Sequence, residues 1–259
     1  MQDHDPPIPE RDISTTFAKG LAVLRVFDDT HSHLTLSEVA ALTGFDRAAV
    51  RRLMLTLVHL GYARRDGRRF SLTPRVLILA GSFLRGNRFG THVQPILNRY
   101  ASLIGSTVSI AIADDHSAVY VAQSVMQEHE ISFGFTIGSR LPLLSTALGR
   151  MLLAYGDPEW VGGVLRRAPL PAHTARTLQD RDAIARAVAQ VRADGYAVVT
   201  AEFEPGITGY AVAIGGLGAA RAVIGTSRPE SDAADPAPII ARLHDAAREI
   251  VQTGVFDGW

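Results

Sequence analysis

The 259-residue sequence contains no cysteine, which excludes disulfide bonds and metal sites built on thiolates. It also has no apolar run that approaches the roughly 20 residues needed to span a bilayer. The first twelve residues, Met1 to Asp12, are polar, acidic and proline-bearing, unlike a secretory signal peptide. We therefore expect a soluble cytoplasmic protein whose residues 1–13 are disordered.

Net charge is absent as well, because 26 Lys and Arg balance 26 Asp and Glu, but the charges are unevenly distributed. Residues 11–90 contain 13 basic and 6 acidic side chains, whereas residues 91–259 contain 13 and 17. Lysine is nearly missing, since Lys19 is the only one. A chain of this length has room for two domains. A cationic first third joined to an acidic remainder indicates a nucleic-acid-binding module that carries a separate sensor.

Residues 35–57 contain the strongest local pattern, two short helices joined by a tight turn. Thr35 and Glu38 form the T-x-x-E capping box that starts the first helix. Gly44 can adopt the positive φ that ends it, and Asp46 caps the second helix. The apolar stripe of the second helix consists of Val50, Leu53, Met54, Leu57 and Leu60.

With this stripe facing the core, the outer face of the second helix is small and basic. It carries Arg47, Ala48, Arg51 and Arg52. Small side chains and forked guanidinium groups at a helix start suit close approach to the major groove. The pattern therefore predicts a helix-turn-helix whose second helix reads duplex DNA.

The neighbouring segments extend this prediction to a winged helix over residues 14–73. Two short extended runs surround Asp66-Gly67, which is typical of a β-hairpin. Arg65, Arg68 and Arg69 flank its tip, where phosphates of DNA would lie. A first helix that completes the small core is supplied by Phe17, Leu21, Leu24, Val26 and Phe27.

Thr73-Pro74 then opens a further helix, which we expect to end around Gly86 or Gly90 and assign to a linker over residues 74–90. It is too apolar for a solvated linker, so we expect it to bury one face against a partner copy or the neighbouring domain.

Residues 91–259 alternate between helical and extended patterns. Strands are expected at 107–113, 118–122, 131–137, 196–203, 207–214 and 222–227. Helices are expected at 93–104, 145–154, from 157 onward, at 179–194 and at 236–252. Strands in hairpin order with interspersed helices predict a mixed, largely antiparallel sheet covered by helices, and hence an α+β protein of two domains.

The candidate motifs for catalysis and metal binding are incomplete or wrongly placed, so we predict no enzyme activity, no metal site and no cofactor. Gly216-Leu-Gly218 begins like a dinucleotide fingerprint but lies between strands and has Arg221 in place of the third glycine. His31 and His33 stand close together without a third ligand. Glu202 and Glu204 are two apart, which fits a charged strand end better than a catalytic carboxylate pair.

Three stretches resemble the IclR family of bacterial transcriptional regulators: Thr35–Gly44, Arg52–Tyr62 and Gly138–Ala154. The similarity extends from about Thr15 to Thr253. Within it, Val119–Ala122, Gly138–Pro142 and Leu170–Thr177 resemble the subgroup that responds to protocatechuate or 4-hydroxybenzoate.

The resemblance implies a GAF-like effector domain over residues 91–259 behind the winged helix. It also implies homodimers formed largely through the N-terminal region, often paired into tetramers, that bind a palindromic operator in double-stranded DNA. The effector would be a small aromatic carboxylic acid, and the regulated genes those of aromatic-acid catabolism. Two alternatives stay open: a regulator sensing a small aliphatic acid such as pyruvate or glyoxylate, and an enzyme tethered to nucleic acid by its N-terminal domain.

Carried over position by position, the resemblance also implies the wall of the effector pocket. That wall comprises Phe133, Leu141, Ala147, Leu148, Val199, Ile207, Gly209, Gly225 and Ser227. From the residues themselves, Phe135 shares a face with Phe133 and suits stacking on a ring. Ser145, Thr146, Thr208, Tyr210 and Ser227 are candidate hydrogen-bond partners for a carboxylate or a phenol. Arg140 either pairs an acid or lies at the surface.

Two local features bear on the ligand. The backbone N–H groups near Ser145–Leu148 open a helix and are suited to a carboxylate. Relatives often have a Ser-Ile/Val-Ala-x-Pro run where this chain has Thr208–Ile214, which lacks the proline and places Gly209 at a pocket position. The missing side chain is expected to enlarge the cavity there.

Overall fold

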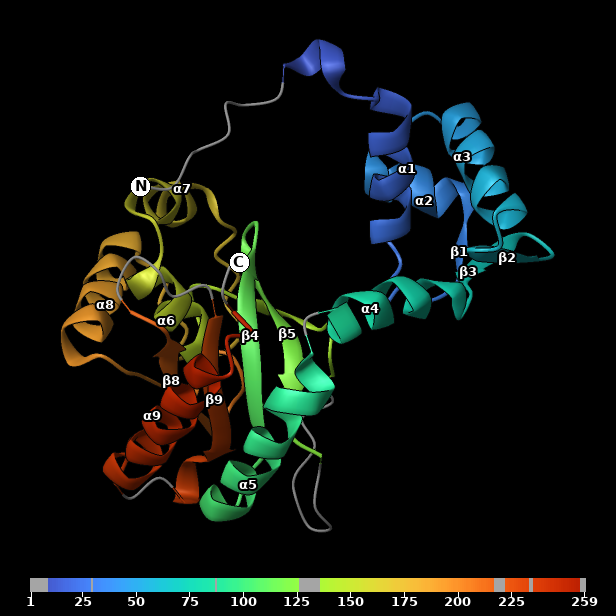
Figure 1. The fold of residues 1–259 in the computed structure, drawn as a ribbon. Coiled ribbons are helices and arrows are strands. Elements are labelled where there is room, and N and C mark those ends of the chain that lie inside the picture. The colour runs from blue at the N-terminus through green and yellow to red at the C-terminus, as the bar shows by residue number, and fades with distance from the viewer. Residues whose placement is uncertain are drawn as a thin grey trace. The chain divides into compact units, whose positions relative to one another are not determined.

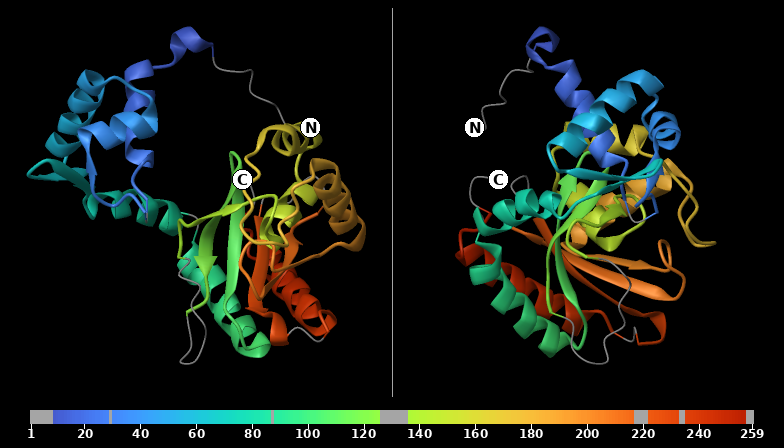
Figure 2. Two further views of the ribbon diagram at one scale, coloured as in Figure 1. Left: turned by 180° about the vertical axis from the view of Figure 1, so that it is seen from behind. Right: turned by 90° about the vertical axis from the view of Figure 1, so that its right-hand side faces the viewer.

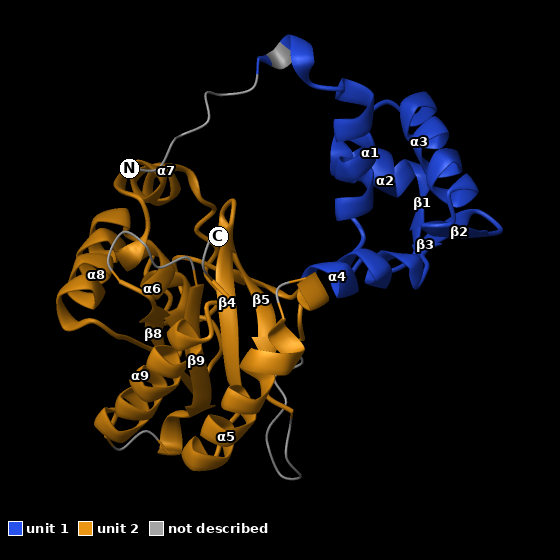
Figure 3. Cartoon of the chain, in the orientation of Figure 1, with its two compact units in different colours: residues 1–83 blue, residues 84–259 orange. Residues whose placement is uncertain are grey.

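The structure, a computed structural model, describes residues 9–28, 30–86, 88–125, 136–216, 222–232 and 235–256. The chain divides into two compact units, residues 1–83 and residues 84–259 (Figure 3). A 3-10 turn, η1 (Glu10–Asp12), lies within the stretch 1–13 that was expected to be disordered, and residues 1–8 lie outside the described ranges.

The first unit is a three-helix core with a small antiparallel sheet. Its elements are α1 (Thr15–Arg25), β1 (Leu34–Thr35), α2 (Leu36–Thr43), α3 (Arg47–His59), β2 (Ala63–Asp66) and β3 (Arg69–Leu72). The strand order is β1-β3-β2, and β2 and β3 form the expected hairpin around Gly67. The short strand β1, which the sequence did not reveal, pairs Leu34 with Phe70 and so attaches the hairpin to the start of α2.

The predicted helix boundaries follow from the caps that the structure contains. The Thr35 N–H donates to Glu38 Oε2 (2.7 Å), and the Thr35 hydroxyl accepts from the Glu38 N–H (3.4 Å), which completes the capping box. Gly44 ends α2 with a φ of 71°. Asp46 then accepts from the Ala49 N–H (2.9 Å) and starts α3.

Two details of the predicted core are wrong. Leu60 is 48% exposed, because α3 ends at His59 and the chain turns there, so its apolar stripe stops at Leu57. Phe17 and Leu21 are also exposed, while Val23 is fully buried. Phe17 and Leu21 are four residues apart on one side of α1, and the helical repeat places Val23 on the other side.

Helix α4 (Arg75–Gly86) follows the hairpin, and no residue of it is buried within this chain. The linker was predicted over residues 74–90, with its helix ending around Gly86 or Gly90. In the structure α4 ends at Gly86, and a π-helical turn, η2 (Phe89–Val93), leads into α5 (Gln94–Ile104).

The second unit is a six-stranded sheet with helices on both faces (Figures 1 and 2). Its strands are β4 (Val108–Asp114), β5 (Ser117–Gln123), β6 (Arg140–Pro142), β7 (Ala197–Thr200), β8 (Ile207–Ile214) and β9 (Ala222–Pro229), in the order β6-β5-β4-β9-β8-β7. Every pairing between the described strands is antiparallel. Helices α5 and α9 (Ala237–Gln252) cover one face.

The other face is covered by α6 (Ala147–Tyr155), with α7 (Pro158–Arg167) and α8 (Arg181–Asp194) outside it. Alternation along each strand sorts the side chains between these layers. Ile110, Val212 and Ile224 face α5 and α9, whereas Ala211 and Val223 face α6. The two units together confirm the predicted α+β architecture.

Several predicted boundaries in this unit need correction. The strand expected at 131–137 falls largely on residues outside the described ranges, and Ile137 lies in a turn. The strand expected through Phe203 ends at Thr200, because Ala201 adopts a φ of 54° and turns the chain. The 3-10 turn η3 (Glu230–Asp232) follows β9. No helix in the described ranges is long and apolar enough to cross a membrane.

Candidate functional site

A basic hollow lies on the first unit between α3 and the hairpin. It measures about 540 Å³ and is lined by Thr35, Leu36, Ser37, Arg47, Arg51, Leu55, Arg65, Arg68 and Phe70. Two of its four arginines come from the first half of α3 and two from the hairpin. Capping by Asp46 and the turn at Gly67 therefore bring together cations that are well separated in the sequence.

The seven residues predicted to contact DNA are all exposed. Ala48, Arg52 and Arg69 lie outside the hollow, and Arg69 donates to the carbonyl oxygen of His33 (2.9 Å), which holds it beside the preceding loop. Among the described residues, neither Arg47 nor Arg51 forms an ion pair with a carboxylate. The surface thus presents uncompensated positive charge at the start of a helix, which suits phosphate and base edges of a nucleic acid.

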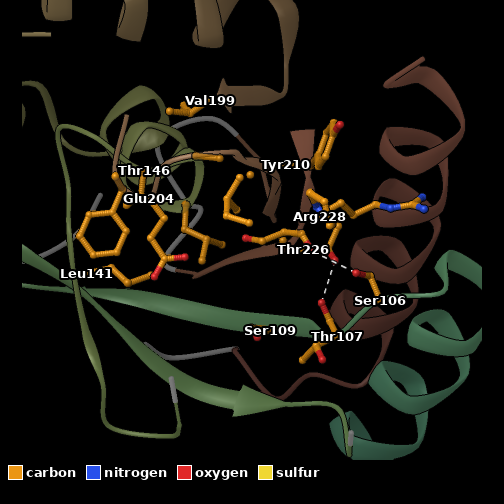
Figure 4. Close-up of a pocket in the computed structure, with 18 of the residues that line it drawn as sticks. Ser106, Thr107, Ser109, Leu141, Thr146, Val199, Glu204, Tyr210, Thr226 and Arg228 are labelled. Atoms are coloured by element: carbon orange, nitrogen blue, oxygen red, sulfur yellow. Dashed lines mark hydrogen bonds between the residues drawn. The ribbon is translucent and has the colours of Figure 1, made fainter. Parts of the chain in front are cut away.

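The second unit contains a cavity of about 220 Å³ between the start of α6 and the sheet (Figure 4). Eleven of the predicted effector residues line it: Leu141, Ser145, Thr146, Ala147, Leu148, Val199, Ile207, Gly209, Tyr210, Gly225 and Ser227. The other two, Phe133 and Phe135, lie outside the described residues. The resemblance and the reasoning from single residues therefore selected positions that the fold brings to one place, from β6, the start of α6, β7, β8 and β9.

Two glycines shape the floor of this cavity. A Cβ on Gly209 would lie 3.3 Å from Cβ of Ala147, so the absence of a side chain leaves space beside the first turn of α6. A Cβ on Gly225 would lie 2.4 Å from the carbonyl oxygen of Tyr210 and 2.8 Å from Cδ2 of Leu148. Gly225 therefore allows α6 to approach the sheet, while Gly209 widens the cavity as the sequence suggested.

The start of α6 provides unused hydrogen-bonding groups. Thr146 caps the helix: its hydroxyl accepts from the Gly149 N–H (3.1 Å) and donates to the Pro142 carbonyl (2.7 Å). The amides of Ala147 and Leu148 precede the first hydrogen bond within the helix. Ser145 is 3% exposed, and its hydroxyl has no hydrogen-bond partner among the described residues.

Two candidate hydrogen-bond partners prove to be used elsewhere. The ring of Tyr210 packs in the core beneath α5 and α9, because position 210 faces away from α6 along β8 (Figure 4). Thr208 is 1% exposed and shares a hydrogen bond with Thr200 (3.2 Å between the hydroxyl oxygens). Arg140, whose role the sequence left open, pairs with Asp114 at the surface.

The charged residues of the 201–206 segment are the main feature that the sequence did not resolve. Glu202 forms a double hydrogen bond with the buried Arg150 of α6, at 2.7 and 2.6 Å, and Arg150 also donates to the Leu144 carbonyl (3.0 Å). Glu204 lines the cavity together with Tyr120 of β5. The two carboxylates are therefore neither a catalytic pair nor a merely solvated strand end.

Burial affects the ionisation of both cavity residues. It raises the pKa of the Glu204 carboxyl. Burial also raises the pKa of the Tyr120 phenol, and the negative charge of Glu204 raises it further. Tyr120 thus remains protonated and Glu204 is an acceptor whenever it is ionised.

Comparisons with known proteins identify both units. The IclR helix-turn-helix domain matches residues 16–67, and the C-terminal domain of IclR bacterial transcriptional regulators matches residues 84–252. The chain belongs to the IclR family. It is a DNA-binding transcriptional regulator rather than an enzyme.

Relatives with assigned roles fall in the expected subgroup. The chain is 39% identical to the Pca regulon regulatory protein of Pseudomonas putida over 203 residues, which cover 78% of this chain and 70% of that protein. It is 32% identical to the p-hydroxybenzoate hydroxylase transcriptional activator of Acinetobacter baylyi over 211 residues, 80% of this chain and 78% of the activator.

Solved structures share the fold. A transcriptional regulator from Rhodococcus sp. RHA1 is 35% identical with a TM-score of 0.73, covering 93% of this chain and 98% of that one. An IclR homolog from Microbacterium hydrocarbonoxydans, complexed with 4-hydroxybenzoate, has a TM-score of 0.74 at 24% identity, covering 91% and 97%. The IclR-type architecture is thus common to all three.

Proposed function

We propose that the cavity of this regulator binds a small aromatic carboxylic acid, 4-hydroxybenzoate or protocatechuate, and that the bound acid alters affinity for an operator of aromatic-acid catabolism genes. The observation that carries this proposal is the unpartnered, buried hydroxyl of Ser145 beside the open start of α6. A helix start with free amides and a hydroxyl donor is a site for a carboxylate.

The volume of the cavity supports a ligand that contains an aromatic ring. A cavity of roughly 150 Å³ with apolar walls is sufficient for benzene, and this one measures about 220 Å³. The additional volume accommodates the carboxylate and hydroxyl substituents of the ring. A two- or three-carbon acid such as glyoxylate or pyruvate would leave much of that space unfilled. The roles of the Pseudomonas and Acinetobacter relatives, and the ligand of the Microbacterium homolog, agree with an aromatic acid.

The proposed DNA-binding residues are the seven exposed residues of α3 and the hairpin. We infer that a homodimer presents two copies of α3 to successive major grooves of a palindromic operator. The exposed apolar side chains of α1 and α4, among them Phe17 (67% exposed) and Ile78 (60% exposed), are suited to an interface with a second copy.

Calorimetry with 4-hydroxybenzoate, protocatechuate and pyruvate tests the proposed effector class. The wild type should bind the aromatic acids and bind pyruvate much more weakly or not at all. Ser145→Ala should weaken aromatic-acid binding about tenfold, because a hydrogen bond to a charged group is lost. Ser102→Ala, on the exposed side of α5, is the matched control and should bind like the wild type. Tight binding of pyruvate with no binding of either aromatic acid would refute the proposal.

A further inference from the structure

Glu204 places a carboxylate in the cavity that no cation of the described chain neutralises. It is partly buried, it lines the cavity, and among the described residues its side chain forms no ion pair or hydrogen bond. Figure 4 shows its carboxylate turned into the cavity beside Leu141. Its neighbour Glu202, by contrast, is fully engaged by Arg150. An unpaired acid in such a place is costly unless a ligand group satisfies it.

The segment that carries Glu204 is held on several sides. The Ala201 carbonyl accepts from the Thr174 hydroxyl (2.6 Å), and the Glu202 carbonyl accepts from the Thr177 hydroxyl (2.6 Å). The Ile207 N–H donates to the Glu204 carbonyl (3.3 Å) and closes the turn. These bonds fix the backbone on both sides of Glu204, so its position in the cavity is built into the fold.

The surroundings of Glu204 specify what it can contact. Tyr120, whose phenol pKa is raised by burial and by the charge of Glu204, also lines the cavity. Among the described residues that line the cavity, Arg228 is the one cation. It lies on the same face of β9 as Thr226, which pairs with Tyr210. Burial raises the pKa of the Tyr210 phenol, and the positive charge of Arg228 offsets part of that rise. Arg228 therefore lies on the face of the sheet that packs against α5 and α9, opposite the face that packs against α6.

An aromatic acid cannot place its own carboxylate beside Glu204, since two carboxylates in contact repel each other. A ring hydroxyl is the complementary group, because an O–H donor forms a strong, short hydrogen bond with a carboxylate. We propose that Glu204 accepts a hydrogen bond from the ring hydroxyl of the effector and thereby selects hydroxybenzoates over benzoate. This inference rests on the proposed function, which assigns the cavity to an aromatic acid.

The test compares 4-hydroxybenzoate with benzoate by calorimetry on the full-length protein. The wild type should bind 4-hydroxybenzoate at least tenfold more tightly than benzoate. In Glu204→Leu the two affinities should become nearly equal, through weaker binding of 4-hydroxybenzoate and unchanged or tighter binding of benzoate. Glu204→Gln keeps the size and should give an intermediate ratio. Glu159→Gln, on the exposed first turn of α7, is the control and should keep the wild-type ratio.

The outcomes separate the two claims. Binding of both acids with the same affinity ratio in the wild type and in Glu204→Leu would overturn the role of Glu204 and leave the aromatic effector standing. An equal loss of both acids in a folded variant would also overturn that role. If Glu204→Leu does not fold, the ratio of the affinities for 4-hydroxybenzoate and benzoate in Glu204→Gln decides whether Glu204 has this role. If the wild type binds neither 4-hydroxybenzoate nor benzoate, both the proposed function and this inference are overturned.

Discussion

Gly149 stands in the first turn of α6, where the helix passes over the chain that leads into it. A Cβ at this position would lie 2.4 Å from both Cα and the carbonyl oxygen of Leu143. Since both are backbone atoms, no rotamer change relieves the clash. The amides that face the cavity are therefore held in place partly by a residue without a side chain.

Gly149→Ala should lower the free energy of unfolding by about 2 kcal/mol, because overpacking outweighs the gain in helix propensity. Urea denaturation measures this change. Gly86→Ala is the matched helical control, since a Cβ there meets nothing within 4 Å. Equal stability of the two variants would show that α6 can move away from Leu143 at little cost.

Arg150 and Glu202 form a buried ion pair that ties α6 to the turn carrying Glu204; their side chains are 6% and 12% exposed. Arg150→Met leaves the carboxylate without its cation and should cost about 3 kcal/mol of stability. Arg140→Met removes an exposed pair with Asp114 and should cost under about 1 kcal/mol. Thermal and urea unfolding of both variants test the contrast, and similar losses would contradict it.

Only some of the residues of the site could be predicted from the sequence. Leu141, Val199 and Gly209 followed from the resemblance, because it was carried over position by position. Glu204 did not, since it lies in a turn without helical or strand periodicity. Its direction depends on the positive φ of Ala201 and on hydrogen bonds from Thr174 and Thr177, which are distant in the sequence.

Among the elements, α3 was predictable nearly to its ends. Its N-cap, the preceding glycine and its apolar stripe are local signals, and local signals determine where a helix starts and which face it buries. The edge strands β1 and β6 were not predicted, because two or three residues carry too little pattern. Each is defined by its partner strand.

The exposed face of α3 leads to a prediction about DNA. Arg51→Ala should weaken binding to a duplex selected from a random-sequence pool by the wild type about tenfold or more, because a base or phosphate contact is lost. Gel-shift titration measures it. Arg242→Ala, an exposed arginine on α9, serves as the control and should leave DNA binding unchanged. Unchanged DNA binding in Arg51→Ala, with calorimetry showing normal effector binding, would refute the assigned face.

At the scale of the whole molecule, the apolar side chains of α4 predict self-association. Leu77, Ile78 and Leu79 are 67%, 60% and 59% exposed in the single chain. Ile78→Glu should shift the protein toward monomer in sedimentation experiments and weaken operator binding, because two linked recognition helices bind more tightly than one. Arg242→Glu, on an exposed part of α9, is the suitable control. Asn98→Glu is not suitable, because Asn98 lies on a partly buried side of α5. A dimer undisturbed by Ile78→Glu would place the interface elsewhere.

We propose that an acid bound in the second unit changes how the protein binds DNA through the first. Fluorescence anisotropy of the selected duplex, titrated with the wild type at zero and at saturating 4-hydroxybenzoate, measures this coupling directly. We expect the Kd for DNA to change about 5- to 150-fold, and Ser145→Ala to require more acid for the same change. An identical Kd with and without the acid, while calorimetry shows the acid bound, would contradict it.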